Sequence, residues 1–283
     1  MTQNILTGIA DEAGADIDSQ IAAHRDLGWN AIELRLINGR NAAGDLAQDQ
    51  FDAAAARIEE AGLTVTGFAS AIGNWSRKIG DDFSRDVTEL RTAIPRMQRF
   101  GTKFIRTMSW VGTGVDDSDW RNEVFRRYRE LASIAEDGGV LLAHENCTGW
   151  AGQSARHMRD LLEAVDSPNL VVLFDIGNTL SYGQSTWSFY QEIKDQIRYV
   201  HIKDSLRNGG YAFPGEGDAI VPEVVGDLLK TGYNGVFSIE PHIANIVHDG
   251  GAKASPEEMY QSYLRYGRMA MELLAAVRPS SSG

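Results

Sequence analysis

Residues 140–146 read VLLAHEN, and three similar runs follow: LVVLFDIGN at 170–178, IRYVHIKD at 197–204 and GVFSIEPH at 235–242. Apolar runs of this kind, rich in Val, Ile and Phe and bounded by Gly, Asn or Asp, are typical of buried parallel strands. Each run ends on a side chain that can ligate a divalent metal ion: Glu145, Asp175, His201 and Glu240. The intervals of 30, 26 and 39 residues each leave room for one strand, one loop and one helix.

The same alternation of strand and helix patterns extends to both ends of the chain. Four further strand-like runs come first: ILTGIADE (5–12), AIELRLI (31–37), LTVTGFAS (63–70) and KFIRTMSW (103–110). Helical patterns lie near 16–27, 47–61, 84–100, 119–136, 154–165, 185–195, 222–231 and 256–276. Eight strands in alternation with eight helices predict an α/β protein, a (β/α)8 TIM barrel, rather than an open doubly wound sheet. We expect one domain over residues 1–277 and a flexible C-terminal tail over 278–283.

The composition argues against several classes of protein. A net charge of −12 disfavours nucleic acid as a partner, because phosphate backbones are bound by clustered Lys and Arg. No apolar run approaches the roughly 18 residues of a membrane span, and the N-terminus shows no signal peptide. The single cysteine, Cys147, fits a reducing compartment. We therefore expect a cytoplasmic protein that binds neither membranes nor nucleic acid.

The predicted barrel would bring the four candidate ligands close together. Residues at the C-terminal ends of its strands converge on one mouth, where the active sites of such barrels lie. Three carboxylates and one imidazole there would form an oxygen-rich metal site. Carboxylates suit Mn²⁺ or Mg²⁺, and the added imidazole favours Mn²⁺, with Co²⁺ and Zn²⁺ as further candidates.

The motifs in this order resemble those of the xylose-isomerase-like TIM barrel superfamily, the sugar phosphate isomerase/epimerase group. They are HEN (144–146), DIGN (175–178), HIKD (201–204), FPGEG (213–217) and GYNGVFSIEPH (232–242), and the resemblance covers nearly the whole chain. It implies that Glu145, Asp175, His201 and Glu240 are the metal ligands. It also implies that Glu145 and Glu240 act as the acid/base pair and that the protein is a homodimer or homotetramer.

The chemistry of such a site follows from what a metal ion does to an α-hydroxy carbonyl compound. The ion acidifies the C–H bond beside the carbonyl, and a carboxylate removes the proton to give a cis-enediolate. Return of the proton to the opposite face gives an epimer, and return to the neighbouring carbon gives an aldose–ketose isomer. We therefore expect a carbohydrate isomerase or epimerase acting on a keto-sugar, an inosose or a related polyol.

Three other functions are considered beside this one. The same enediolate can expel a β-substituent, which would make the protein a lyase, either a dehydratase or a keto-sugar deglycosylating enzyme. A non-catalytic sugar-binding or accessory subunit is the third hypothesis, although the intact ligand set argues against it. A DNA-repair endonuclease on this barrel would need additional histidines where the chain has Ser70, Trp110 and Asn178.

Further substrate contacts are expected in the loops after the last strands. Lys203 follows His201 and could bind substrate hydroxyls or pair with Asp204. Arg207 stands where related ketose epimerases have a substrate-binding arginine, and Glu216 lies in a glycine-rich loop that could approach a sugar. For Arg207 and Glu216 the alternative is an ordinary solvated loop residue.

Three candidates come from other strands. Asn178 departs from many relatives, which have a histidine there; asparagine can bind a hydroxyl group but cannot titrate near neutral pH. Trp110 ends a strand and could stack on a sugar, although a buried tryptophan more often simply packs. Glu33 alternates with apolar residues on its strand, and a hydrogen bond from substrate to this carboxylate is expected if its side chain points inward.

Overall fold

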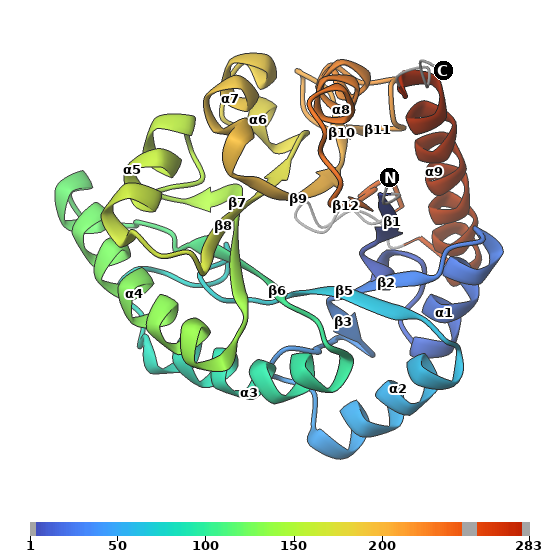
Figure 1. Ribbon diagram of the computed structural model, residues 1–283, viewed down its shortest axis with the longest axis horizontal. Coiled ribbons are helices and arrows are strands. Elements are labelled where there is room, and N and C mark those ends of the chain that lie inside the picture. The colour runs from blue at the N-terminus through green and yellow to red at the C-terminus, as the bar shows by residue number, and fades with distance from the viewer. Residues whose placement is uncertain (1–3, 245–253, 279–283) are drawn as a thin grey trace.

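The computed structural model describes residues 4–244 and 254–278, and its centre is a ring of eight parallel strands (Figure 1). They are β1 (Ile5–Gly8), β2 (Ala31–Leu34), β5 (Thr64–Ala69), β6 (Phe104–Ser109), β7 (Leu141–Gly149), β8 (Leu170–Asp175), β9 (Ile197–Ile202) and β12 (Val236–Ile239). Neighbours pair in the order β1-β12-β9-β8-β7-β6-β5-β2, and a parallel bridge between Ile9 and Glu33 links β1 to β2. The predicted (β/α)8 barrel is confirmed.

Helices surround the ring on its outside (Figure 1). They are α1 (Ile17–Asp26), α2 (Gln48–Glu60), α3 (Ser84–Phe100), α4 (Asp117–Gly138), α5 (Ala155–Val165), α7 (Thr186–Ile193), α8 (Val221–Lys230) and α9 (Pro256–Val277). Their bounds agree with the predicted helical patterns to within a few residues. Some ends follow from local chemistry: the Ser154 hydroxyl accepts the His157 N–H at the start of α5, and Ser255 and Glu258 form a capping box on α9.

Several short elements lie outside the predicted pattern. An additional short helix, α6 (Asn178–Ser181), precedes α7, and the chain between them passes through Gly183 with a φ of 64°. Two small hairpins, β3 (Leu36–Ile37) with β4 (Arg40–Asn41) and β10 (Asp204–Ser205) with β11 (Tyr211–Ala212), follow β2 and β9. Helix α6 and the two hairpins lie at the C-terminal ends of barrel strands, where the functional loops of such barrels are found.

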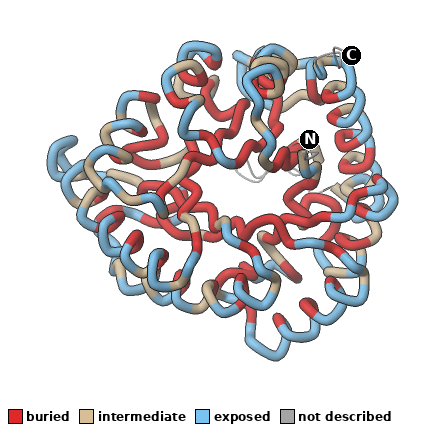
Figure 2. The backbone as a smooth tube through the Cα atoms, viewed as in Figure 1, coloured by how far each residue is buried: buried red, intermediate tan, exposed pale blue. Residues whose placement is uncertain are grey.

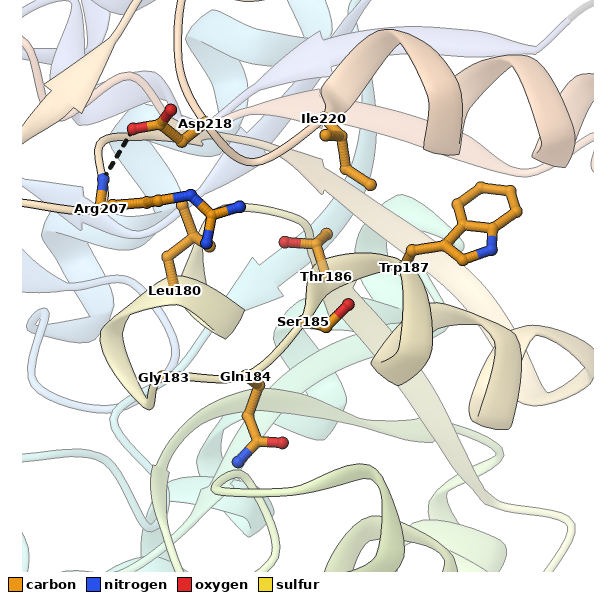
Figure 3. A pocket seen from close by; sticks show the side chains of 9 residues that line it. All are labelled: Leu180, Gly183, Gln184, Ser185, Thr186, Trp187, Arg207, Asp218 and Ile220. Atoms are coloured by element: carbon orange, nitrogen blue, oxygen red, sulfur yellow. Dashed lines mark hydrogen bonds between the residues drawn. The ribbon is translucent and has the colours of Figure 1, made fainter.

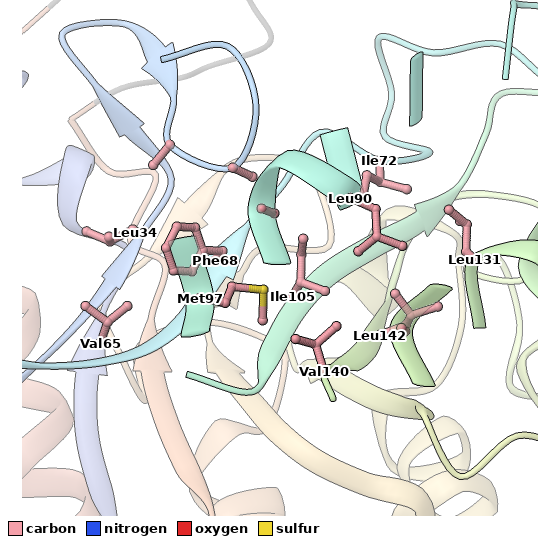
Figure 4. Close-up of a cluster of buried hydrophobic side chains, with 14 of the residues drawn as sticks. Leu34, Val65, Phe68, Ile72, Leu90, Met97, Ile105, Leu131, Val140 and Leu142 are labelled. Carbon is pink, nitrogen blue, oxygen red and sulfur yellow. The ribbon is translucent and has the colours of Figure 1, made fainter. Parts of the chain in front are cut away.

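The hydrophobic core lies mainly between the barrel and its helices. The burial map shows buried residues concentrated along the strands and on the inner faces of the helices (Figure 2). In the part drawn in Figure 4, Phe68 and Ile105 on β5 and β6 pack with Leu90 and Met97 of α3. Each of these side chains is almost fully buried, which stabilises the fold by roughly 1.5–3 kcal/mol per side chain. The barrel strands, whose C-terminal ends form the mouth, are therefore held in place by packing against the surrounding helices.

Two expectations from the sequence concern the C-terminal tail and membrane-spanning segments. The predicted tail over 278–283 falls outside the described residues except for its first residue, Arg278, which follows the end of α9. Within residues 4–244 and 254–278, no helix combines the length and the apolar character that crossing a membrane requires.

A buried histidine behind the barrel makes the stability of the fold depend on pH. Nδ1 of His24 on α1 lies 2.7 Å from the carbonyl oxygen of Gln20, and Nε2 lies 3.1 Å from the hydroxyl of Tyr263. Burial lowers the pKa of His24 from 6.5 to about 4. The native state therefore holds the ring neutral, whereas the unfolded chain takes up a proton below pH 6.5.

We expect this histidine to contribute to acid destabilisation. Its contribution is fully present above pH 6.5, and it falls by about 2–3 kcal/mol as the pH drops to 4.5. Urea unfolding of the wild type and of His24→Asn at pH 7 and pH 4.5 measures the effect. The variant should lose less stability between the two pH values, and an equal loss in both proteins would contradict the assignment.

Candidate metal centre at the C-terminal mouth

The four predicted ligands meet in one buried cluster. Glu145 lies within β7, Asp175 ends β8, His201 lies on β9, and Glu240 directly follows β12. Asp175 and His201 are register partners on adjacent strands, which brings their side chains to the same level of the barrel. One ligand atom from each of the four residues lies within 4.8 Å of the others, and all four residues are buried. The group could hold a divalent ion.

The orientation of His201 fits a metal ligand. Its Nε2 lies 3.2 Å from both carboxylate oxygens of Glu33, so Nε2–H donates to this acid, and Nδ1 is the nitrogen that could bind a metal ion once it has lost its proton. Nδ1 faces Glu240 at 3.4 Å and Glu145 at 3.9 Å, and it is buried without a hydrogen-bond partner among the described residues. A carboxylate behind an imidazole whose other nitrogen faces acidic oxygens is the usual arrangement around a metal-binding histidine.

The Glu33 carboxylate is itself firmly held. It accepts hydrogen bonds from the hydroxyl of Tyr199 at 2.8 Å and from the hydroxyl of Ser238. Burial would raise the pKa of Glu33, but His201 and the two hydroxyl groups together outweigh that effect, and the pKa lies below its ordinary value. Glu33 thus points inward, which is the condition set for a substrate contact, and it contacts the candidate ligand His201. Its predicted contact with substrate stays a prediction.

The three carboxyl groups differ in their affinity for protons. Burial would raise the pKa of Glu145, but Arg106 and His201 together outweigh it and the pKa is lowered. Burial is likewise outweighed at Glu240, where Lys203 leads the groups that hold the pKa well below its ordinary value. At Asp175 burial prevails over the attraction of Lys203, and the pKa is raised. Two carboxyl groups thus stay ionised, and one holds its proton more readily.

Lys203 and Asn178 belong to this cluster. The Lys203 ammonium group lies 2.7 Å from Asp175 Oδ2 and 2.8 Å from Glu240 Oε2. The Asn178 side chain donates to Glu145 Oε1 at 3.1 Å. Lys203 does not pair with Asp204, the alternative considered from the sequence, because the Asp204 carboxylate is occupied by backbone N–H groups.

The other three predicted contacts lie apart from the cluster. Trp110 is buried in the core, where its indole N–H donates to Asp86 Oδ2 at 3.1 Å and its ring lies beside Arg127. Glu216 is exposed in its loop. Arg207 is exposed too and lines a pocket of about 360 Å³ between the α6–α7 segment and the loop before α8 (Figure 3). None of the four cluster residues lines that pocket, so these three roles rest on the sequence alone.

A layer of charged residues surrounds Glu240, and one of them, Arg106, was not singled out from the sequence. Arg35 donates to Glu240 Oε1 at 3.2 Å while binding Asp11, and His242 Nδ1 lies 2.8 Å from Glu12 Oε1. Arg106 on β6 lies near both Glu240 and Glu145. Its sequence signal was available: a charged residue in the middle of the apolar run KFIRTMSW needs a buried partner.

Asp204 organises the loop that follows β9. Its carboxylate oxygens accept the backbone N–H groups of Ser205 at 3.0 Å, Gly215 at 2.8 Å, Gly217 at 3.0 Å and Ala219 at 3.2 Å. A carboxylate that accepts several backbone N–H groups ties distant parts of a loop together. Asp204 is therefore a loop anchor, which explains its place in the motif HIKD without any contact to substrate.

Removal of this anchor should loosen the loop. Asp204→Ala leaves several N–H groups without an acceptor, so we expect the free energy of unfolding to fall by at least about 2 kcal/mol. Hydrogen exchange at Gly215, Gly217 and Ala219 should accelerate with it. Asp218→Ala is the matched control, since the side chain of the exposed Asp218 accepts one N–H, that of Arg207, among residues 4–244 and 254–278. Equal protection of the loop in both variants would refute the anchoring role.

The fold and the cluster define a class: a (β/α)8 barrel with a carboxylate–imidazole site at its C-terminal mouth. The chain matches the family model of the xylose isomerase-like TIM barrel over residues 21–266, and it belongs to that family. This agrees with the resemblance seen in the motifs.

Comparisons with individual proteins support the same placement. The chain is 23% identical to an inosose dehydratase of Bacillus thuringiensis (strain Al Hakam) over 151 residues, covering 46% of this chain and 50% of that protein. It is 30% identical to a fructoselysine 3-epimerase of Escherichia coli O157:H7 over 115 residues, covering 39% and 42%. The matches thus span half or less of these curated relatives. A D-tagatose 3-epimerase-like structure superposes with a TM-score of 0.75 over 98% of both chains at 18% identity, which shows a shared fold.

Proposed function

We propose that this protein is a divalent-metal-dependent enzyme that isomerises or epimerises a carbohydrate through an enediolate. The observation that carries the proposal is the cluster of Glu145, Asp175 and Glu240 around Nδ1 of His201, whose Nε2 is held by Glu33. The family membership and the names of the two curated relatives, a dehydratase and an epimerase, support a small polyhydroxy carbonyl compound as substrate. A keto-sugar or an inosose is the class we expect.

The four ligands fit a Mn²⁺ ion best, with Mg²⁺, Co²⁺ and Zn²⁺ as alternatives, because three hard oxygen donors outnumber one nitrogen. A bound ion would polarise the carbonyl group and stabilise negative charge on its oxygen. The histidine must be neutral at the nitrogen that binds metal, so metal binding releases a proton and weakens at low pH. This agrees with the pKa of His201, which burial would lower but which Glu33, Glu145 and Glu240 together raise well above its ordinary value.

The proton transfers fall to the two glutamates in this proposal. Glu145 and Glu240 come from strands three places apart in the sheet, so their carboxylates approach the cluster from different sides. Both are held ionised by neighbouring cations, which prepares either one to accept a proton from the substrate carbon. The other glutamate returns a proton after taking one up from water, or water itself returns it. Asn178 and Lys203 are placed to hold substrate hydroxyl groups.

A lyase on the same site is the second candidate, because one curated relative is named a dehydratase. Its first step, removal of the proton beside the carbonyl, is the same and needs the same residues. The two functions differ only afterwards: a lyase loses a β-substituent from the enediolate, whereas an isomerase or epimerase returns the proton.

Deuterium incorporation from D₂O tests the proposal and separates the two candidates. Mn²⁺-loaded protein would be incubated with ketoses, 3-keto-sugars and inososes, and the products analysed by mass spectrometry after removal of protein and metal. Deuterium at one carbon beside the carbonyl, with an isomer accumulating, supports the isomerase or epimerase. Loss of water or another β-group supports the lyase. No exchange in any compound with metal bound would count against catalysis and favour a sugar-binding role.

A further inference from the structure

Arg106 is a buried guanidinium group with few hydrogen bonds. It lies on β6, and its side chain is 7% exposed. Its Nε is 3.4 Å from Glu145 Oε2, and its Nη1 is 3.6 Å from Glu240 Oε1, both long for a charged hydrogen bond. One hydrogen bond is formed, from Nη2 to the carbonyl oxygen of Ser70 at 3.4 Å, and Nε has no hydrogen-bond partner in the part of the chain that the structure describes.

Other buried arginines of the same chain are bound more tightly. Arg77 donates to Asp86 at 2.6 Å and also to Glu89. Arg96 donates to the carbonyl oxygens of Ala42 at 2.9 Å and Leu46 at 2.7 Å. Their Nε atoms, like that of Arg106, have no hydrogen-bond partner among the described residues, but their Nη groups have the close partners that a buried charge needs.

Arg127 also has close hydrogen-bond partners: it donates to Glu123 at 2.9 Å and to the carbonyl oxygen of Asp81 at 3.1 Å. Arg77, Arg96 and Arg127 lie between the barrel and its helices or loops, where they bind fixed partners. Arg106 differs because its loosely bound donors point at the two glutamates of the metal cluster. Once those oxygens serve a metal ion, a further acceptor is needed for the guanidinium.

We propose that Arg106 binds the substrate and donates hydrogen bonds to the oxygen that becomes negative when the proton is removed. The inference rests on the proposed function and adds a residue to it. In the step concerned, the C–H bond breaks and its proton passes to a glutamate oxygen. The electron pair of that bond forms the C=C bond of the enediolate, while the carbonyl π pair moves to the oxygen. A guanidinium beside both glutamates is placed to stabilise this charge.

Geometry and chemistry make arginine suited to this role. Its N–H groups lie in one plane and stay protonated at any physiological pH, so they can donate two parallel hydrogen bonds to a flat O–C–C–O group. A lysine has the charge but not the planar pair of donors. The same contact would favour substrates that can form a planar enediolate over saturated polyols, and it makes Arg106 a determinant of specificity.

Binding of oxalate, a flat dianion that mimics an enediolate, tests the proposal without a known substrate. Calorimetry would compare Mn²⁺-loaded wild type, Arg106→Met and Arg106→Lys for oxalate and for the neutral polyol xylitol. We expect Arg106→Met to weaken oxalate binding at least about tenfold and Arg106→Lys to lie between, with xylitol and Mn²⁺ affinity not weakened. Arg156→Met, on the outer face of α5 with a side chain 81% exposed, is the control.

Each outcome decides the question. Unchanged oxalate affinity in a folded Arg106→Met protein overturns the role of Arg106, and if that variant melts early the Arg106→Lys result decides in its place. Wild type that binds Mn²⁺ but not oxalate also overturns the role, while leaving the metal site standing. Wild type that binds no divalent ion overturns the proposed function itself, and the inference with it.

Discussion

Replacing Glu240 with glutamine is expected to lower deuterium incorporation into the substrate by about 10²–10⁴-fold, the usual contribution of a general acid or base. Glutamine keeps the size of the side chain and one oxygen but cannot accept a proton. Glu145→Gln should act in the same way. The rate of exchange is measured in D₂O with saturating Mn²⁺, using whichever compound the wild-type protein exchanges.

Two measurements distinguish the loss of a proton-accepting group from unfolding of the variant and from loss of the bound metal ion. Melting temperature and bound metal are measured on each variant, and Glu272→Gln, an exposed change on α9, serves as the control with wild-type exchange. Substantial exchange by both Glu145→Gln and Glu240→Gln would rule out the assignment of these two residues as the acid/base pair.

The second large effect concerns the histidine of the cluster. His201→Ala removes the one nitrogen ligand, and we expect the affinity for Mn²⁺ to fall by more than the roughly 10–100-fold that loss of an outer partner costs. Glu33→Gln should cost about that smaller amount, because the amide no longer fixes the Nε2–H form of the ring. Titration calorimetry with Mn²⁺ at pH 7.5 measures both.

The order of the two effects is the informative result. His24→Asn, a change to a buried histidine outside the cluster, gives the comparison for loss of stability alone. If His201→Ala bound Mn²⁺ as tightly as wild type, the ion would lie elsewhere. If Glu33→Gln had no effect while His201→Ala did, Glu33 would be free for the substrate contact predicted from the sequence.

The strands and the four ligands could be predicted because their signal is local. Each candidate ends an apolar run, and the barrel by itself brings strand ends together, so Glu145, Asp175, His201 and Glu240 needed no knowledge of packing. Their meeting within 4.8 Å follows from topology. The same reasoning predicted the helices, whose period is a property of short segments.

The surrounding contacts depend on side chains that cross the barrel, which a local pattern cannot reveal. Glu33 and His201 are 168 positions apart, and Arg35 and Glu240 are 205 apart. Trp110 illustrates the converse: it ends a strand, as a substrate contact would, but its φ of 53° takes the chain out of strand geometry and its ring into the core. The backbone conformation at a strand end decides which way the side chain points, and a local sequence pattern does not reveal that conformation.

Elemental analysis of the purified protein, loaded with Mn²⁺ and dialysed, tests the central claim most directly. One buried group of four ligands should retain about one divalent ion per chain, and His201→Ala treated in the same way should retain far less. A wild-type protein that keeps no divalent ion, or a variant that keeps as much as wild type, would contradict the account of a metal centre at this mouth.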